Sequence, residues 1–469
     1  MGTEIKKKKQ TMMCVEKLKL NNVKNKKLKS QTVSKISGIT LIALVVTIVV
    51  LLILAGITIS LVFSENGIIA KAKEAAEKTN QAAINEQEQM NGLGTTIENM
   101  LNGTGGSGEE TTPPEPTLPS DGSYSKEKGV NTPKLGSGMT PIKWNGSSWV
   151  NTTGSDKDWY DYTSKKWANA KTSDGSMWVW IPRYAYSITS GYHSSSAGNI
   201  DVEFMKGLTN ETSTGRKSFN NASGQGKWNI HPAFNYGQTV SGIWVAKFEA
   251  SNSGGKIKVE PGVQSWRSIT VNDIYTNCLN YNKTLNSHMM KNDEWGAVAY
   301  LSKSKYGKNA EVDINDDSSY YTGGGSGNAY VNNVGQSTTG TVHGVYDMSG
   351  GAYEYVAAYV NNGNSSLSNG ESLVNGDAKT KNVYSKGSSD DRDSNYSANS
   401  GKYGDAVYET SVNGNSSNSS WYGDDSYFPD TNSPFFLRGA FYGAGTSGGV
   451  FYFDYEDGNS FNTYSFRPV

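Results

Sequence analysis

The chain has 469 residues and a formal net charge of −1, from 43 Lys and Arg against 44 Asp and Glu. This length leaves room for two or three domains, and the balanced charge excludes the strongly basic composition typical of nucleic-acid-binding proteins. The aromatic content of 11 Trp, 28 Tyr and 13 Phe supplies enough large side chains for a sizeable hydrophobic core.

A basic leader precedes a long uncharged segment. Residues 1–37 are rich in lysine and contain only Glu4 and Glu16 as acids, and residues 39–63 carry no charge. At about 1.5 Å per residue, the uncharged segment is long enough to cross a hydrocarbon core of roughly 30 Å. Because basic flanks stay in the cytoplasm, we expect a transmembrane helix with its C-terminal side facing outward. A cleaved secretory signal is disfavoured, since the run is too long and no small-residue cleavage pattern follows it.

The junction between these two segments carries a motif. Gly38 is followed by Ile39, Thr40, Leu41 and Ile42, and this resembles the leaders of prepilins, which a membrane peptidase cuts after a glycine. The resemblance implies cleavage between Gly38 and Ile39, methylation of Ile39, and prepilin peptidase and other pilins as partners. Ala43 replaces the family's usual glutamate, which is thought to pair with a neighbouring N-terminus in the filament, so polymerisation is in question. A plain membrane anchor is the alternative.

The segment after the uncharged run is rich in helix formers. Residues 64–90 contain Ala, Glu, Lys and Gln, with a weakly apolar face at spacings of three and four. We expect one long helix over 39–101, as in the spine of a pilin, followed by a Pro/Gly/Thr linker over 102–122. A solvated helical stalk is the alternative. Because Cys14 would leave with the leader 1–38, no internal disulfide framework is expected.

From residue 123 onward Gly, Asn, Ser and Tyr dominate, and short aromatic strands alternate with turns. Residues 123–175 are predicted to form a small β-rich lead-in, with a hairpin over 141–150 around Asn145-Gly146. Further along the chain, buried strands are indicated by β-branched and aromatic runs at 177–184 and 241–249. Two helices are predicted at 271–281 and 291–301, the second capped by Asn292 or Asp293.

Four motifs occur in order within residues 176–469. They are Asp293-Glu294-Trp295, the run Y-D-M-S-G-G-A-Y-E-Y at 346–355, Arg438-Gly439-Ala440, and Ser465-Phe466-Arg467. Together they resemble the formylglycine-generating, sulfatase-modifying family, a variant of the C-type lectin fold. Gly351 departs from the family's asparagine, and tyrosines replace its tryptophans. The expected fold class is therefore α+β: a long N-terminal transmembrane or pilin-type helix, a linker, and a C-type lectin-like domain over 176–469.

The resemblance does not extend to the chemistry of that family. Its enzymes bind copper through two cysteines shortly after the R-G-G motif, whereas residues 440–449 contain none and copper(I) requires soft sulfur ligands. The four histidines show no metal spacing; they are His193, His231, His288 and His343. We therefore expect no enzyme and no cofactor. Ca²⁺ is an alternative at Asp313, Asn315, Asp316 and Asp317, although the full EF-hand spacing is absent and a solvated Asx turn is favoured.

The C-terminal stretch is rich in Tyr, Ser, Gly and Asn, which binding loops favour. In lectin-type folds it lies on an exposed ligand face, and it is similar to the terminal stretch of the variable proteins of diversity-generating retroelements. The predicted ligand-binding residues are Tyr442, Thr446, Tyr452, Asp454, Tyr455, Glu456, Asn459, Asn462 and Tyr464. Strand alternation would turn Tyr452, Asp454 and Glu456 outward. Packing of these aromatics between strands is the alternative.

The sequence thus predicts a pilin-like display protein in the cell membrane, exposed at the cell surface or on a pilus. Its non-catalytic lectin-like domain would bind an unknown protein or glycan ligand, and no nucleic acid. A structural pilin or pseudopilin of a secretion or uptake machine is the first alternative. An oxidase of the formylglycine-generating type is the second, disfavoured because the cysteine pair is absent.

Overall fold

The structure, a computed structural model, describes residues 121–469 apart from 364 and 390. The leader 1–38 with Gly38 and Ile39, the expected helix over 39–101 and most of the linker 102–122 lie outside these residues. The chain divides into two units between Pro113 and Pro114, and all of the described residues belong to the second unit.

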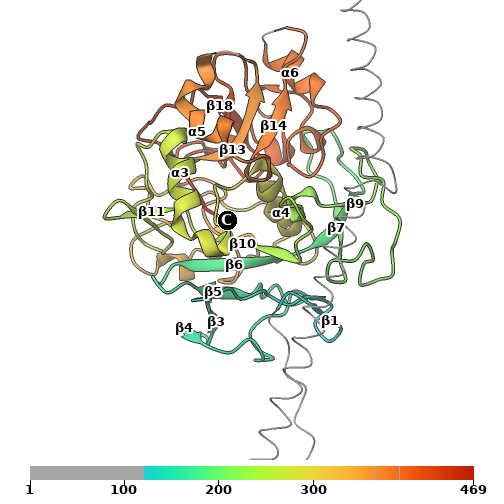
Figure 1. Ribbon diagram of the computed structural model, residues 1–469, viewed down its shortest axis with the longest axis vertical. Coiled ribbons are helices and arrows are strands. Elements are labelled where there is room, and N and C mark those ends of the chain that lie inside the picture. The colour runs from blue at the N-terminus through green and yellow to red at the C-terminus, as the bar shows by residue number, and fades with distance from the viewer. Residues whose placement is uncertain (1–120, 364, 390) are drawn as a thin grey trace, which may run out of the picture. The chain divides into compact units, whose positions relative to one another are not determined.

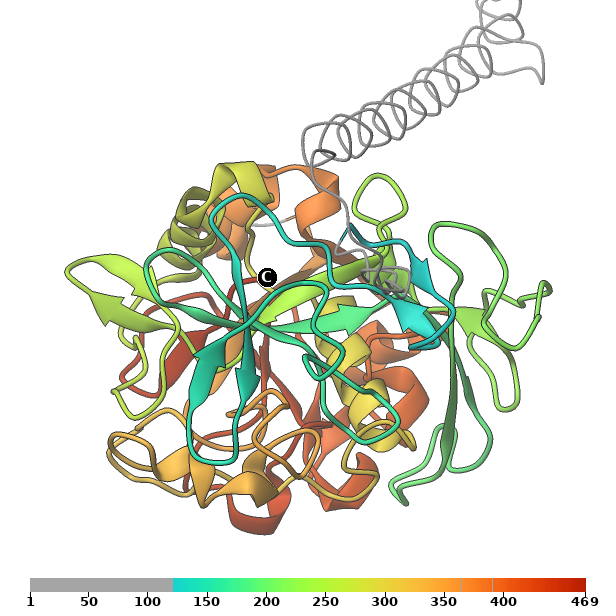
Figure 2. The ribbon, with the colours of Figure 1, turned by 90° about the horizontal axis from the view of Figure 1, so that it is seen from below.

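One sheet has five antiparallel strands in the order β10-β6-β5-β3-β4 (Figure 1). Its strands are β3 (Thr140–Trp144), β4 (Trp149–Asn151), β5 (Asn169–Lys171), β6 (Met177–Pro182) and β10 (Gly242–Ala246). Figure 2 shows this sheet from below, with its turquoise strands nearest the viewer. The predicted hairpin is confirmed, since Asn145 Oδ1 accepts hydrogen bonds from the amides of Ser147 and Ser148 at the turn between β3 and β4. The sheet also joins the lead-in 123–175 to the rest of the domain.

A second sheet has seven strands and holds most of the sequence motifs. Its strands are β13 (Tyr353–Asn361), β14 (Asn382–Ser385), β15 (Asn415–Ser416), β16 (Ser426–Tyr427), β17 (Phe435–Arg438), β18 (Phe453–Glu456) and β19 (Tyr464–Phe466). The central strand β13 pairs antiparallel with β17 and parallel with both β14 and β19. This pairing brings the motif at 346–355 beside the two C-terminal arginine motifs.

Smaller sheets complete the β structure. They are β1 (Tyr124–Ser125) with β2 (Val130–Asn131), β7 (Tyr184–Ile188) with β8 (Ile200–Phe204) and β9 (Asn229–Ile230), and β11 (Ser251–Ser253) with β12 (Lys256–Lys258).

Helices α3 (Val271–Tyr281) and α4 (Asn292–Lys303) lie between β13 and β6 in the view of Figure 1. The side chain of Thr270 caps α3 by accepting from the amide of Asp273 at 3.2 Å. At the start of α4 the cap residue is Lys291, whereas Asn292 or Asp293 was predicted, and Glu294 Oε2 accepts from the Lys291 amide at 2.9 Å. Every residue of α4 except Lys303 is buried, so this helix is the centre of the core. The helices α5 (Glu371–Asn375) and α6 (Arg392–Ala398) are short.

The expected fold class is wrong. The part of the chain that the structure describes is β-rich, with nineteen strands and four α-helices, of which the longest has 12 residues. The physical reason is the Gly-, Asn- and Ser-rich composition after residue 123, which favours turns and short strands over long helices. Within residues 121–469 as described, no helix has both the length and the apolar character to cross a membrane.

The C-terminal segment ties the two large sheets together. The carbonyl of Pro468 accepts from the amide of Ala246 in β10 at 3.1 Å, and the carbonyl of Phe466 accepts from Ala250 at 2.9 Å. Val469 exchanges two backbone hydrogen bonds with His288, each 2.9 Å long. Because β19 also pairs with β13, residues 464–469 are hydrogen-bonded on both sides and lie between the two large sheets.

Candidate ligand-binding face

A buried ion pair holds the last strand to the centre of the seven-stranded sheet. Arg467 is fully buried and donates to both carboxylate oxygens of Glu354, with Nε 2.9 Å from Oε2. Its remaining donors reach the carbonyls of Ala246 at 2.9 Å and Tyr346 at 3.0 Å. A bidentate pair whose other donors are satisfied fixes geometry more strictly than a surface ion pair does.

Two more buried carboxylates lie in the same network. Burial raises the pKa of Glu354 to about 7 against the opposing charge of Arg467, and burial likewise raises the pKa values of Glu249 and Asp347. Glu249 Oε1 accepts from the amide of Ala352 at 2.9 Å. A side chain at Gly351 would place its Cβ 2.6 Å from that oxygen, so this position has no room for a residue larger than glycine. The network thereby fixes the backbone that leads into Tyr353.

Tyr353 is the centre of an aromatic cluster above this network. Its ring centroid lies 5.3 Å from Phe441 in a stacked arrangement, 5.7 Å from Tyr464 and 5.8 Å from Tyr452. Phe461 extends the cluster, with its ring 5.3 Å from Tyr464 and its side chain 57% exposed. Offset and edge-on contacts at these distances hold the rings in place.

The cluster continues to a second loop. Tyr442 follows Phe441 and meets Tyr320 edge-on at 5.0 Å. The guanidinium of Arg267 lies 3.9 Å from the ring of Tyr320 and donates to the carbonyl of Asn462 at 2.5 Å. We call the half-buried and exposed members the aromatic face: Arg267, Tyr320, Tyr353, Phe441, Tyr442, Phe461, Asn462 and Tyr464.

The structure brings together only some of the predicted ligand-binding residues. Tyr442, Asn462 and Tyr464 belong to the aromatic face, and Glu456 accepts from the Tyr464 hydroxyl at 2.5 Å. The exposed side chains are those of Thr446, Asn459 and Asn462, and the half-buried ones are those of Tyr442, Asp454, Tyr455, Glu456 and Tyr464. Tyr455 packs elsewhere, with its ring 3.5 Å from the Arg392 guanidinium.

The expected outward orientation of Tyr452 is wrong. This side chain is 4% exposed, and its hydroxyl donates to Asp454 Oδ2 at 2.5 Å. The strand β18 begins only at Phe453, so the alternation of a strand does not apply to Phe451 and Tyr452, which are both buried. Burial raises the pKa of Asp454 to about 6, and the Tyr452 hydrogen bond opposes this rise. Tyr452 is therefore a buried side chain that packs against Tyr353 of the aromatic face.

Several members of the face were missed from the sequence. Arg267 and Tyr320 lie far from the C-terminal stretch along the chain, and only the folded loops bring them to Tyr442. Tyr353 lies inside a recognised motif and is the first, half-buried residue of β13. Its place in that motif was the sequence signal that could have found it. Phe441 and Phe461 lie within the terminal stretch, but they are not among the predicted ligand-binding residues.

The residues considered for metals or redox chemistry do not converge. Asp313 pairs with Lys308 at 2.6 Å, Asn315 is buried against Asp347, and Asp317 Oδ1 accepts from Ser319 in an Asx turn. No group of three or more His, Cys, Asp or Glu side chains suited to a metal is found within the described part of the chain. Cys278 is buried in α3, and burial raises the pKa of its thiol.

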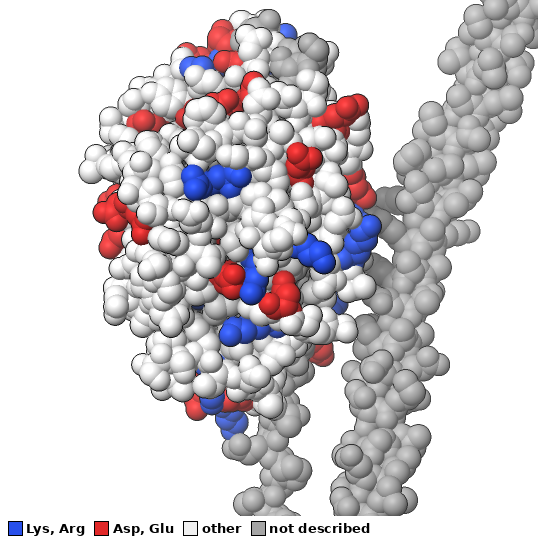
Figure 3. Space-filling model, turned by 90° about the vertical axis from the view of Figure 1, so that its left-hand side faces the viewer, with Lys and Arg blue, Asp and Glu red and all other residues white. Residues whose placement is uncertain are grey.

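Figure 3 shows one side of the domain, on which acidic and basic side chains are scattered with wide uncharged areas between them. On this side neither sign of charge forms a continuous patch. Comparison with known proteins adds no family: no protein-family model matches the chain, and no curated protein matches it.

Proposed function

We propose that this protein is a non-catalytic recognition protein of the cell surface, which binds a protein or glycan ligand through the aromatic face of its C-terminal domain. One observation carries the proposal: partly exposed aromatic rings from three loops and from the first residues of β13 and β19 form a continuous cluster beside the buried Arg467–Glu354 pair. Such rings offer large contact area at low entropic cost, because each tyrosine fixes only two side-chain torsions on binding.

The surroundings of the cluster support binding more than catalysis. Tyrosine hydroxyls and the exposed amide of Asn462 provide hydrogen-bonding groups around apolar ring faces, a combination suited to sugar rings and to peptide side chains. The thiol pair of the formylglycine-generating enzymes is absent from residues 440–449. The only described cysteine is buried, away from solvent, whereas a reactive thiol needs access.

Placement at the cell surface rests on the sequence. The basic leader, the uncharged run 39–63 and the Gly38-Ile39 junction favour membrane attachment with prepilin-type processing. Recovery of the protein in the membrane fraction after cells are sheared would support a display role. Recovery in sheared filaments would favour a structural pilin instead.

The binding proposal is tested with the purified full-length protein on a glycan and protein array. Tyr442→Ala and Phe461→Ala should each abolish the binding of any ligand found, because both remove ring area from the face. Tyr124→Ala is the matched control, since Tyr124 is also partly exposed but lies in β1. Equal loss of binding in the control, or peptide-cysteine oxidation by the wild-type protein, would overturn the proposal.

A further inference from the structure

A small pocket separate from the aromatic face contains a buried carboxylate with an unused oxygen. Asp424 is 1% exposed, and its Oδ2 accepts from the amide of Phe451 at 2.9 Å. Its Oδ1 is buried and has no hydrogen-bond partner among the described residues. An unpaired buried acceptor is costly and calls for a partner such as a water molecule or an ion.

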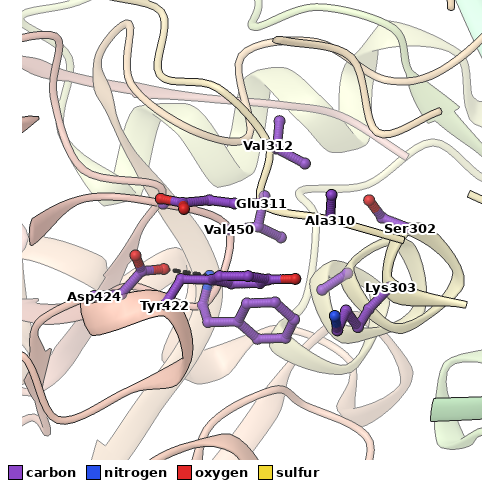
Figure 4. A pocket seen from close by; sticks show the side chains of 11 residues that line it. Ser302, Lys303, Ala310, Glu311, Val312, Tyr422, Asp424 and Val450 are labelled. Carbon is purple, nitrogen blue, oxygen red and sulfur yellow. Dashed lines mark hydrogen bonds between the residues drawn. The ribbon is translucent and has the colours of Figure 1, made fainter. Parts of the chain in front are cut away.

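The pocket has one acidic and one basic end. In Figure 4 the carboxylates of Asp424 and Glu311 lie on the same side, while Lys303 lies at the opposite end beyond the ring of Tyr422. The ammonium of Lys303 lies 5.1 Å from the centre of that ring, so an aromatic ring separates it from Asp424. Two carboxyl groups therefore lie at one end, where no cationic side chain forms a salt bridge with Asp424 or Glu311 within the described residues. The buried Arg438 acts on Asp424 only through a longer-range attraction.

The pocket holds a single small particle. Its volume is about 10 Å³, which corresponds to one water-sized sphere. Gly449 closes it, because a Cβ at that position would lie 2.5 Å from Asp424 Oδ1. Tyr422 adopts a φ of 67°, a strained conformation for a tyrosine, directly beside Asp424. Its buried hydroxyl also has no hydrogen-bond partner among the described residues.

We infer that this pocket binds one hard divalent cation, Ca²⁺ or Mg²⁺, between the carboxylates of Asp424 and Glu311, with water molecules on the solvent side, where Glu311 is exposed, as the remaining ligands. Oxygen ligands of this kind are those that both cations prefer, and one or two carboxylates with waters make a common site. A water molecule would satisfy only a hydrogen bond of Asp424 Oδ1, whereas a divalent cation would also bind both carboxyl groups in their ionised form.

Such a cation would also brace the loop that carries the aromatic face. Gly449, Val450 and Phe451 line the pocket and follow Phe441 and Tyr442 by a few residues. The amide of Asp425 donates to the carbonyl of Ser447 at 2.9 Å, so the two segments already touch beside the proposed site. The inference stands independently of the ligand-binding proposal, because it needs no ligand on the face.

The test uses the full-length protein, with Ca²⁺, Mg²⁺ and Tb³⁺ as probes after treatment with a chelator. A saturating divalent cation should raise the midpoint of thermal unfolding by about 3 °C or more. Tb³⁺ should show emission sensitised by the nearby Tyr422 and Trp421, and Ca²⁺ should displace it. Both responses should be lost in Asp424→Asn, which keeps the shape of the side chain and removes its charge.

Two further variants keep the inference falsifiable if Asp424→Asn does not fold. Glu311 is exposed, so Glu311→Gln should fold normally and weaken binding by roughly 10-fold, since ligand charge sets affinity at such sites. Asp316→Asn is the matched control, because Asp316 is an exposed acid of the alternative calcium loop, and it should leave binding unchanged. The absence of any response in the wild type would mean that the pocket holds water only. That result, or a response lost in Asp316→Asn and kept in Glu311→Gln, would overturn the inference.

Discussion

The strand β17 and the loop after it differ sharply in burial. All four residues of β17 are buried, whereas none of the residues 441–447 is. The strand ends on Arg438, whose guanidinium donates to the carbonyl of Ala406 at 3.0 Å deep in the core, while the loop presents Phe441 and Tyr442 on the aromatic face. The buried support and the loop that carries the proposed recognition surface are therefore adjacent segments, so side chains of the loop can be changed with little effect on the strand.

The largest effect is expected from Arg467→Met. The variant removes the fully buried partner of Glu354 and leaves that carboxylate unpaired beside Glu249 and Asp347. We expect the free energy of unfolding to fall by about 3–5 kcal/mol, measured by chemical denaturation. Arg216→Met is the matched control, because the Arg216–Glu203 ion pair is partly exposed and should contribute less than about 1 kcal/mol. Equal effects would show that the buried Arg467–Glu354 pair contributes no more to stability than a partly exposed ion pair does.

The second prediction concerns pH and the buried Glu409. Burial raises the pKa of this carboxyl from 4.5 to about 7, opposed by hydrogen bonds that include those from Gly404 and the Tyr186 hydroxyl. Between pH 4.5 and 7 the folded protein therefore keeps a proton that the unfolded chain releases. Stability should fall as the pH rises through this window, by about 3 kcal/mol from this group.

Glu409→Gln tests this dependence. The variant should reduce the slope of unfolding free energy against pH, because it removes the titrating group. The slope should not vanish, since burial also raises the pKa values of Glu354 and Asp454. Glu371→Gln, an exposed position at the start of α5, should keep the wild-type slope. A slope that is the same in all three proteins would contradict the prediction.

A smaller effect is expected from Tyr452→Phe, which removes the hydroxyl that donates to Asp454 and keeps the buried ring. Loss of a hydrogen bond to a carboxylate should cost about 1–2 kcal/mol of stability. Tyr427→Phe is the control, because the Tyr427 hydroxyl meets only Ser417 at an exposed position. If Tyr452→Phe abolished ligand binding without loss of stability, Tyr452 would be a ligand-contacting residue after all.

The smallest effect on stability is expected at the exposed ends of the face. Asn462→Ala keeps the backbone carbonyl that Arg267 contacts, and it should change the free energy of unfolding by less than about 0.5 kcal/mol. Binding of a ligand identified on the array should nevertheless weaken. Thermal unfolding and binding measured on the same preparation separate the effect on stability from the effect on binding. A parallel loss of both would show that the Asn462 side chain supports the fold.

Local signals in the sequence predicted local structure well. The turn at Asn145-Gly146 specified its hairpin, and the helix predicted over 271–281 has the bounds that α3 shows. Propensity and turn chemistry act over a few residues, so one sequence suffices to read them. The predicted fold class is wrong because the Gly-, Asn- and Ser-rich composition after residue 123 favours turns and short strands over long helices.

Long-range contacts explain most of what the sequence did not reveal about the site. The meeting of Tyr320 with Tyr442, and of Arg267 with Asn462, depends on loops more than a hundred residues apart. Tyr452 was misplaced for a local reason, since β18 begins at Phe453 and the alternation of a strand does not reach Tyr452. Tyr455 does not belong to the aromatic face, because its ring packs against the guanidinium of Arg392 in α6. No sequence pattern predicts this contact.

The position of β19 has a consequence for biosynthesis. Since Tyr464–Phe466 inserts beside β13 and residues 466–469 bond to both large sheets, the domain cannot close before residues 464–469 have left the ribosome. Pairings between such distant segments also slow folding. The nascent chain should therefore remain open until residues 464–469 emerge, which leaves time for chaperones to engage it.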